Sequence, residues 1–137
     1  MNFLIIEPIS EKEAALMNPL QLAYIGDAVW DLVVRNLLIR QGYNVHHMHS
    51  VCIQHVNAHA QAAYIQDLYE ELLPDEKELV RRGRNAHVHH PVPKNQNPED
   101  YALATGFEVL IGFHHLTGNQ ERIQMLAEKI FGGEKNG

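Results

Sequence analysis

The chain has 137 residues, of which 45% are hydrophobic and 20% charged, an ordinary composition for a globular protein of one domain. The apolar segment near its N-terminus, FLII, is too short and too closely followed by glutamates for a signal peptide, and no stretch is apolar enough to span a membrane. The single cysteine, Cys52, fits a reduced compartment and is interpreted as a small core residue rather than a catalytic thiol. We expect a soluble, cytoplasmic protein with one domain over 1–137, a core over about 18–132 and a frayed end at 134–137.

The charge of the chain is unevenly distributed. The formal net charge is −6, which by itself argues against a nucleic-acid partner. However, residues 81–97, RRGRNAHVHHPVPKNQN, contain four Lys/Arg and no acid, so all 17 Asp/Glu lie elsewhere. This segment is therefore either a basic patch suited to a phosphate backbone or a solvated loop whose arginines pair with helix acids.

Apolar periodicity and capping signals predict helices along the chain, and no segment shows the alternation of a half-buried strand. The proline-containing segment 86–97 has the composition of a loop. The fold class predicted is all-α, a helical bundle, with helices over 9–17, 18–42, 46–55, 58–72, 75–84, 98–117 and 119–131.

The helix over 18–42 is the expected centre of the fold. Asn18 suits the N-cap, Pro19 the first helical position, and Gly42 the left-handed residue just beyond the C-terminus. The helix is apolar nearly all round, yet it carries Asp27 and Asp31 in its middle. Asp27 should therefore lie at or near buried surface, which makes it the first functional candidate.

A second apolar helix, over 98–117, carries Glu108 alone in its interior. Glycines lie close to both acids: Gly26 precedes Asp27, while Gly106 and Gly112 flank Glu108. Interior helical glycines are tolerated where backbones approach closely, so we expect the two helices to cross near Gly26, Gly106 or Gly112 and to bring the acids together. Two such carboxylates need a divalent cation such as Mg²⁺ or Mn²⁺, or one of them stays protonated. The alternative is that the acids pair with arginines such as Arg35.

Two motifs carry a resemblance to a known family. LAYIGDAVWDLVVRNLL resembles the first ribonuclease III motif, an E-x-x-E-F-L-G-D-A-type helix that supplies metal-binding acids, and GFEVLIGFHHL resembles the second, D-x-F-E-A-x-I-G. The length, RRGRNA at 81–86 and PKN at 93–95 are more similar to Mini-ribonuclease III, the bacterial branch without a double-stranded-RNA-binding domain. The resemblance spans about 18–132 and implies a helical, homodimeric endonuclease domain.

The resemblance assigns Asp27 and Glu108 as the catalytic and metal-binding residues. The chain departs from full-length ribonuclease III at three acidic positions, which here are Leu20, Ala23 and Thr105, although Thr105 fits the Mini-ribonuclease III pattern. Asp31, one turn after Asp27, either supports the ligands from outside or is a surface acid.

The implied activity is Mg²⁺-dependent hydrolysis of double-stranded precursor RNA, notably 23S ribosomal RNA, leaving 5′-phosphate and 3′-hydroxyl ends. A two-fold symmetric homodimer would place one site at each strand. Without an appended binding domain, the catalytic domain must hold the duplex itself, by shape, phosphates and 2′-hydroxyls. Asn85 either contacts RNA or caps a helix. The candidate RNA-binding residues are Arg81, Arg82, Arg84, Asn85, His87, His89, His90 and Lys94.

The ten histidines suggest competing interpretations. The clusters at 46–49 and 87–90 could bind zinc, but solvated surface histidines are the commoner case, and His114 and His115 are expected on the outside of the second core helix. An all-α metal phosphohydrolase is disfavoured because the His-Asp dipeptide usual in that class is absent: no histidine in this sequence is followed directly by aspartate. A non-catalytic RNA-binding or ribosome-assembly protein is the remaining alternative, and the presence of both Asp27 and Glu108 argues against it.

Overall fold

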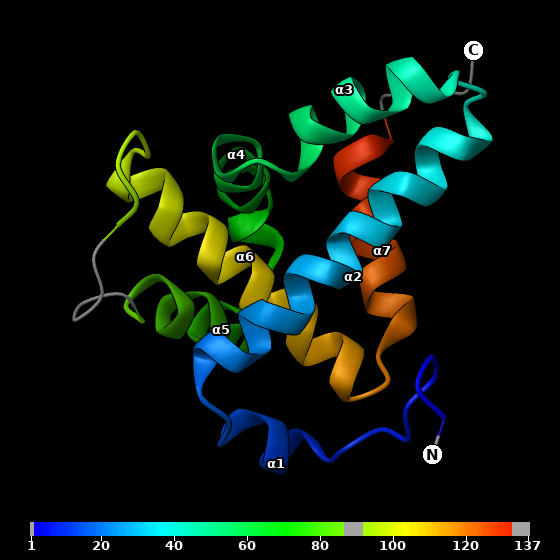
Figure 1. Cartoon of the computed structure of the whole chain (residues 1–137). Helices are drawn as coiled ribbons and strands as arrows, with labels where there is room; N and C mark the ends of the chain where they lie inside the picture. The colour runs from blue at the N-terminus through cyan, green and yellow to red at the C-terminus, as the bar shows by residue number, and fades with distance from the viewer. Residues whose placement is uncertain (1, 87–91, 133–137) are drawn as a thin grey trace.

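The computed structural model describes residues 2–86 and 92–132, and every regular element in these ranges is a helix (Figure 1). The predicted all-α class is therefore confirmed. Among these helices none is long and apolar enough to cross a bilayer. The elements are α1 (Glu11–Ala15), α2 (Pro19–Arg40), α3 (Val45–Val56), α4 (Ala58–Leu68), the 3₁₀ turn η1 (Tyr69–Glu71), α5 (Pro74–Arg84), α6 (Pro98–Leu116) and α7 (Gln120–Phe131).

The helix boundaries follow local signals in the sequence. Asn18 accepts a hydrogen bond from the Leu20 N–H (2.9 Å) as the N-cap of α2, and Asn97 caps α6 in the same way through the Asp100 N–H (3.0 Å). Gly42 lies in the left-handed region at φ +77°, two residues after the end of α2. The helix expected over 58–72 ends earlier, at Leu68, and continues as η1. Residues 134–137, predicted to be frayed, lie outside the described ranges.

Helix α6 is the core of the fold, and α2, α4, α5 and α7 pack around it (Figure 1). Its residues from Leu103 to Phe107 and from Val109 to His114 are buried, so nearly the whole circumference is covered. Trp30 of α2 is fully buried and packs edge-to-face on Phe107 of α6, with ring centroids 4.9 Å apart. Its indole N–H donates to the His55 carbonyl (3.0 Å), which satisfies the polar atom of this core residue.

Glycines allow α2 and α6 to cross in direct backbone contact. A Cβ on Gly26 would lie 1.9 Å from the Glu108 carbonyl oxygen, and a Cβ on Gly112 would lie 1.9 Å from the Leu22 carbonyl oxygen. The predicted crossing is confirmed at these two residues. Gly106 has a different partner: a Cβ there would lie 2.8 Å from the Val80 carbonyl oxygen, so this glycine admits α5 rather than α2.

One face of α2 is exposed in the isolated chain, although this helix is apolar nearly all round. Tyr24, Leu32 and Ile39 are 84%, 55% and 64% exposed, and they recur along one side of the helix. Asp27 is also exposed, and it lies near buried surface because its carboxylate faces the partly buried Glu108. The apolar side chains of α2 therefore lie on two faces of the helix. One face packs on α6, and the other is exposed.

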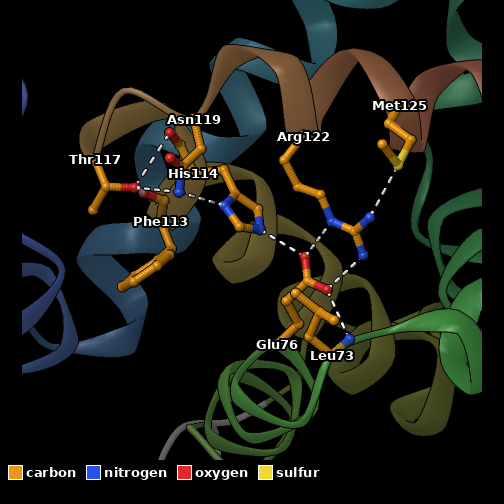
Figure 2. A network of polar contacts seen from close by, with 8 residues as sticks. All are labelled: Leu73, Glu76, Phe113, His114, Thr117, Asn119, Arg122 and Met125. Atoms are coloured by element: carbon orange, nitrogen blue, oxygen red, sulfur yellow. Dashed lines mark hydrogen bonds and ion pairs between the residues drawn. The ribbon is translucent and has the colours of Figure 1, made fainter.

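A buried ion-pair network joins α5, α6 and α7 (Figure 2). Glu76 is 2% exposed and accepts hydrogen bonds from Arg122 Nη2 (2.6 Å), Arg122 Nε (2.8 Å), His114 Nε2 (2.8 Å) and the Leu73 N–H (2.9 Å). Burial opposes ionisation of Glu76, but these hydrogen bonds and the charge of Arg122 outweigh it and lower its pKa to about 2. The Asn119 amide lies 3.2 Å from His114 Nδ1, so it donates to that nitrogen while Nε2–H donates to Glu76.

This network corrects two expectations for the C-terminal half of the chain. His114, expected on the outside of its helix, is 6% exposed because its imidazole bonds to Glu76. The apolar pattern over 119–131 also predicts Met125 in the core, but Met125 is 46% exposed and its Sδ accepts a hydrogen bond from Arg122. Cys52 is buried as predicted.

Candidate active site

A pocket of about 290 Å³ lies between the N-terminal halves of α2 and α6 and the first turns of α4. It contains both acids that the sequence singled out. The residues that line it are Leu20, Ala23, Tyr24, Asp27, Val56, Ala58, Gln61, Tyr101, Ala104, Thr105 and Glu108.

Asp27 and Glu108 meet across the helix crossing. Gly26 places its Cα against the Glu108 carbonyl, so the residue that follows it on α2 lies beside the Glu108 side chain. Burial, a hydrogen bond with Asp27 and the negative charge of Asp27 together raise the pKa of Glu108 to about 9. In the metal-free protein near neutral pH, Glu108 is therefore a protonated acid that donates to the Asp27 carboxylate.

The donor set of this pair fits a magnesium ion. Mg²⁺ binds oxygen ligands and takes one or two protein carboxylates while keeping several waters. Asp27 and Glu108 supply two such groups beside an open pocket, and a cation there would replace the proton that they now share. No group of three or more His, Cys, Asp or Glu side chains suited to a metal occurs in ranges 2–86 and 92–132. Mg²⁺ held by two protein carboxylates ordinarily completes its coordination with water and substrate phosphate oxygens.

Asp31 does not line this pocket. Its carboxylate pairs with Arg35 (2.8 Å) on the exposed side of α2 and accepts from the Cys52 thiol at 3.8 Å. Burial and the Asp31 charge raise the pKa of Cys52. Pairing with Arg35, considered above for Asp27 and Glu108, therefore occurs at Asp31 instead, whereas Asp27 and Glu108 face each other.

Positions 20, 23 and 105, where the resembled family carries further acids, converge on the same pocket as Asp27 and Glu108. Thr105 is 4% exposed, and its hydroxyl donates to the Tyr101 carbonyl (2.9 Å) within α6. The motif comparison placed these positions near the catalytic pair, and their convergence is consistent with it. With Leu20, Ala23 and Thr105 present, the wall of the pocket is uncharged at all three positions.

Sequence reasoning missed Gln61, a pocket residue on α4 that is 2% exposed. The signal was available, because Gln61 precedes Ile65 and Leu68 by four and seven residues and so shares their buried face. A glutamine in an apolar stripe indicates either a satisfied core amide or a ligand contact.

The basic segment is only partly described. Arg81 pairs with Glu78 and Arg84 with Glu99 (2.9 Å), both on exposed surface, while Asn85 ends α5 and Lys94 is exposed. Arg82 instead donates to the carbonyls of Ala15 (2.7 Å) and Met17 (3.1 Å), so it anchors the link between α1 and α2. The remaining predicted RNA contacts, His87, His89 and His90, lie outside the described ranges.

Comparison with known proteins agrees with this geometry. A family model described as "Ribonuclease III domain" matches residues 20–119, which places the chain in the class of ribonuclease III domains. A Mini-ribonuclease 3 from Symbiobacterium thermophilum is 44% identical over 106 residues, covering 77% of this chain and 81% of the relative. Another, from Thermoanaerobacter sp., is 38% identical over 130 residues, covering 93% and 91%.

A solved structure is similar over most of its length. The crystal structure of a Fusobacterium nucleatum protein superposes with a TM-score of 0.80 at 27% identity, covering 88% of this chain and 96% of that one. The chain therefore belongs to the ribonuclease III family and, within it, to the Mini-ribonuclease 3 group.

Proposed function

We propose that this protein is a Mg²⁺-dependent endoribonuclease that cleaves double-stranded regions of precursor RNA. Membership of the Mini-ribonuclease 3 group supports an RNA endonuclease. The observation that supports the metal chemistry is the Asp27–Glu108 pair, in which two carboxyl groups meet beside an open pocket and the pKa of Glu108 is raised to about 9. A bound Mg²⁺ would supply a nucleophile from water at neutral pH and stabilise charge on the phosphate oxygens.

The protein's own groups position and shield the reaction. Asp27 and Glu108 lie on helices held at fixed separation by the contacts of Gly26 and Gly112, so the two carboxylates present a preorganised pair. Glu108 must release its proton when a cation binds, so its raised pKa makes cation binding dependent on pH. Burial limits water around the Glu108 carboxyl group, whereas Asp27 is exposed to solvent. No protein nucleophile is needed, and the products would carry 5′-phosphate and 3′-hydroxyl ends.

The proposed substrate is structured precursor RNA, with 23S ribosomal RNA as the specific candidate. The exposed Arg81, Arg84 and Lys94 lie on α5 and before α6, where they would meet phosphates. Arg81 and Arg84 would exchange their partners Glu78 and Glu99 for phosphate oxygens. Binding should therefore weaken steeply as salt concentration rises.

We also propose that the protein is a homodimer formed through α2. The exposed apolar side chains Tyr24, Leu32 and Ile39 form a stripe along this helix, and covering it would remove their apolar surface from water. Tyr24 also lines the catalytic pocket, so the stripe lies directly beside the site. A two-fold axis along this face would place the two sites on the same side of an RNA duplex. Gel filtration tests the dimer, and a monomer in complex with RNA would contradict it.

Cleavage of duplex RNA by the purified protein, with and without Mg²⁺, is the decisive test. We expect cleavage only with the cation, and we expect Asp27→Asn to abolish it while duplex binding remains. Asp67→Asn, the same change at an exposed position of α4 outside the pocket, is the matched control and should leave cleavage intact. If the unmodified protein binds the duplex without cutting it in Mg²⁺, the protein is an RNA-binding or assembly factor instead.

A further inference from the structure

Gln61 is a buried polar side chain with an unsatisfied donor. It is 2% exposed, and within the described part of the chain its Nε2 has no hydrogen-bond partner. It lines the same pocket as Asp27 and Glu108 but comes from a third helix, α4. Leaving a buried amide donor unpaired is unfavourable, and most buried polar groups in folded proteins are paired. A hydrogen-bond acceptor placed next to Nε2 would therefore stabilise this side chain.

The chemistry of the pocket limits which groups can accept a hydrogen bond from Gln61 Nε2. A side-chain NH₂ group donates hydrogen bonds and cannot ligate a cation, so the metal itself does not satisfy Nε2. Ala58, in the first turn of α4, lines the same pocket, so the positive end of an 11-residue helix also faces this space. Leu20, Ala23 and Thr105 add no charge there. The part of the pocket formed by α4 therefore offers an amide donor and a helix N-terminus in the same space as the two acids. These groups together suit an anionic or hydroxyl oxygen.

We propose that Gln61 is a substrate-binding residue, whose side-chain amide donates to an oxygen of the RNA backbone held beside Asp27 and Glu108. The proposal rests on the proposed function, since it assumes that RNA occupies this pocket. The acceptor is a phosphate oxygen or a 2′-hydroxyl of the nucleotide at the site. Gln61 thereby contributes a neutral donor, from a third helix, to the pocket that the two carboxylates line.

The test compares Gln61→Met, which keeps the length of the side chain and removes the donor, with the unmodified protein. In the Asp27→Asn background, where cleavage is blocked, fluorescence anisotropy measures affinity for an RNA duplex. We expect Gln61→Met to weaken binding about 10-fold or more if the acceptor is a phosphate oxygen, and about 2- to 10-fold if it is a 2′-hydroxyl. Two modified duplexes distinguish these acceptors: a methylphosphonate at the mapped cleavage site removes a phosphate oxygen, and a 2′-deoxy nucleotide there removes the 2′-hydroxyl. Gln61→Met should no longer weaken binding to the duplex that lacks the true acceptor.

Thermal unfolding separates this role from a structural one. Because the buried donor is unpaired in the free protein, Gln61→Met should leave Tm unchanged or raise it by about 2–4 °C. Gln124→Met, at an exposed position of α7 remote from the pocket, is the control and should bind RNA normally. A fall in Tm with unchanged RNA affinity would show that Gln61 is a core residue and would overturn the proposal.

Gln61→Glu distinguishes RNA binding from a role toward the cation. A carboxylate at this position retains an acceptor and loses the donor, so RNA binding should fall at least as much as in Gln61→Met. If Gln61→Glu instead keeps RNA affinity and binds Mn²⁺ more tightly, the side chain acts on the metal and the proposal is wrong. The proposed function fails separately, by absence of cleavage in the unmodified protein with Mg²⁺.

Discussion

The raised pKa of Glu108 leads to a quantitative prediction for the stability of the Glu108→Gln variant. The pKa of Glu108 is about 9 in the folded protein against an ordinary 4.5, so folding opposes its ionisation. Folding favours the neutral form of Glu108. The contribution of this residue to the free energy of unfolding is therefore fully present below about pH 4.5, and it declines as the pH rises toward 9. Each pH unit in this window costs about 1.4 kcal/mol, which amounts to about 3 kcal/mol at pH 7. Glutamine stays neutral and can donate to Asp27, so the metal-free variant should be more stable by about that amount.

Urea unfolding in EDTA, at several pH values from 5 to 8, measures this difference. We expect the stability gap between Glu108→Gln and the unmodified protein to widen with pH, and we expect Mg²⁺ to narrow or reverse it by binding the unmodified pair. Glu121→Gln, the same change at an exposed position of α7, should alter stability by less than about 0.5 kcal/mol. A gap that stays constant over this pH range would refute the inference that Glu108 is held protonated.

Three further predictions follow from contacts elsewhere in the fold. Glu76→Gln should destabilise the protein by about 3 kcal/mol at pH 7, because the pKa of Glu76 is about 2 in the folded protein and its ionised form therefore adds stability above about pH 4.5. Urea unfolding measures this loss of stability, which should shrink as the pH falls toward 2. Gly26→Ala places a Cβ 1.9 Å from the Glu108 carbonyl oxygen, so it should lower Tm despite the better helix propensity of alanine and should reduce cleavage; an unchanged Tm would contradict the close crossing. Lys94→Ala should weaken RNA binding and reduce the salt slope by about one without changing Tm, and an unaltered slope would remove Lys94 from the interface.

Local sequence signals predict most of the secondary structure because they act within one or two turns. Asn18, Asn57 and Asn97 each accept a hydrogen bond from the first turn of the helix that follows, so the starts of α2, α4 and α6 depend on neighbouring residues alone. The 3₁₀ turn after Leu68 has no comparable signal in the apolar pattern, and the predicted helix accordingly extended too far.

The side chains that pair across the fold were less predictable. A histidine near the end of an apolar helix has the same local pattern whether it faces water or a buried carboxylate, and His114 faces Glu76 only because α5 and α7 close around it. The exposure of Asp27 could not be inferred either, because an apolar helix gives the same periodicity whether both faces are covered or one is left outside.

For the candidate site, the sequence by itself singled out the residues that we propose carry the chemistry. An acid near glycine in each of two apolar helices is costly unless it has a function, and the two motifs singled out Asp27 and Glu108. Only the tertiary structure decided how these residues act. The contact of Gly26 with the Glu108 carbonyl brings the two acids together, burial and the neighbouring Asp27 raise the pKa of Glu108, and the packing of α4 adds Gln61 to the pocket. Distances and desolvation arise between helices that are far apart in the chain, so no local pattern encodes them.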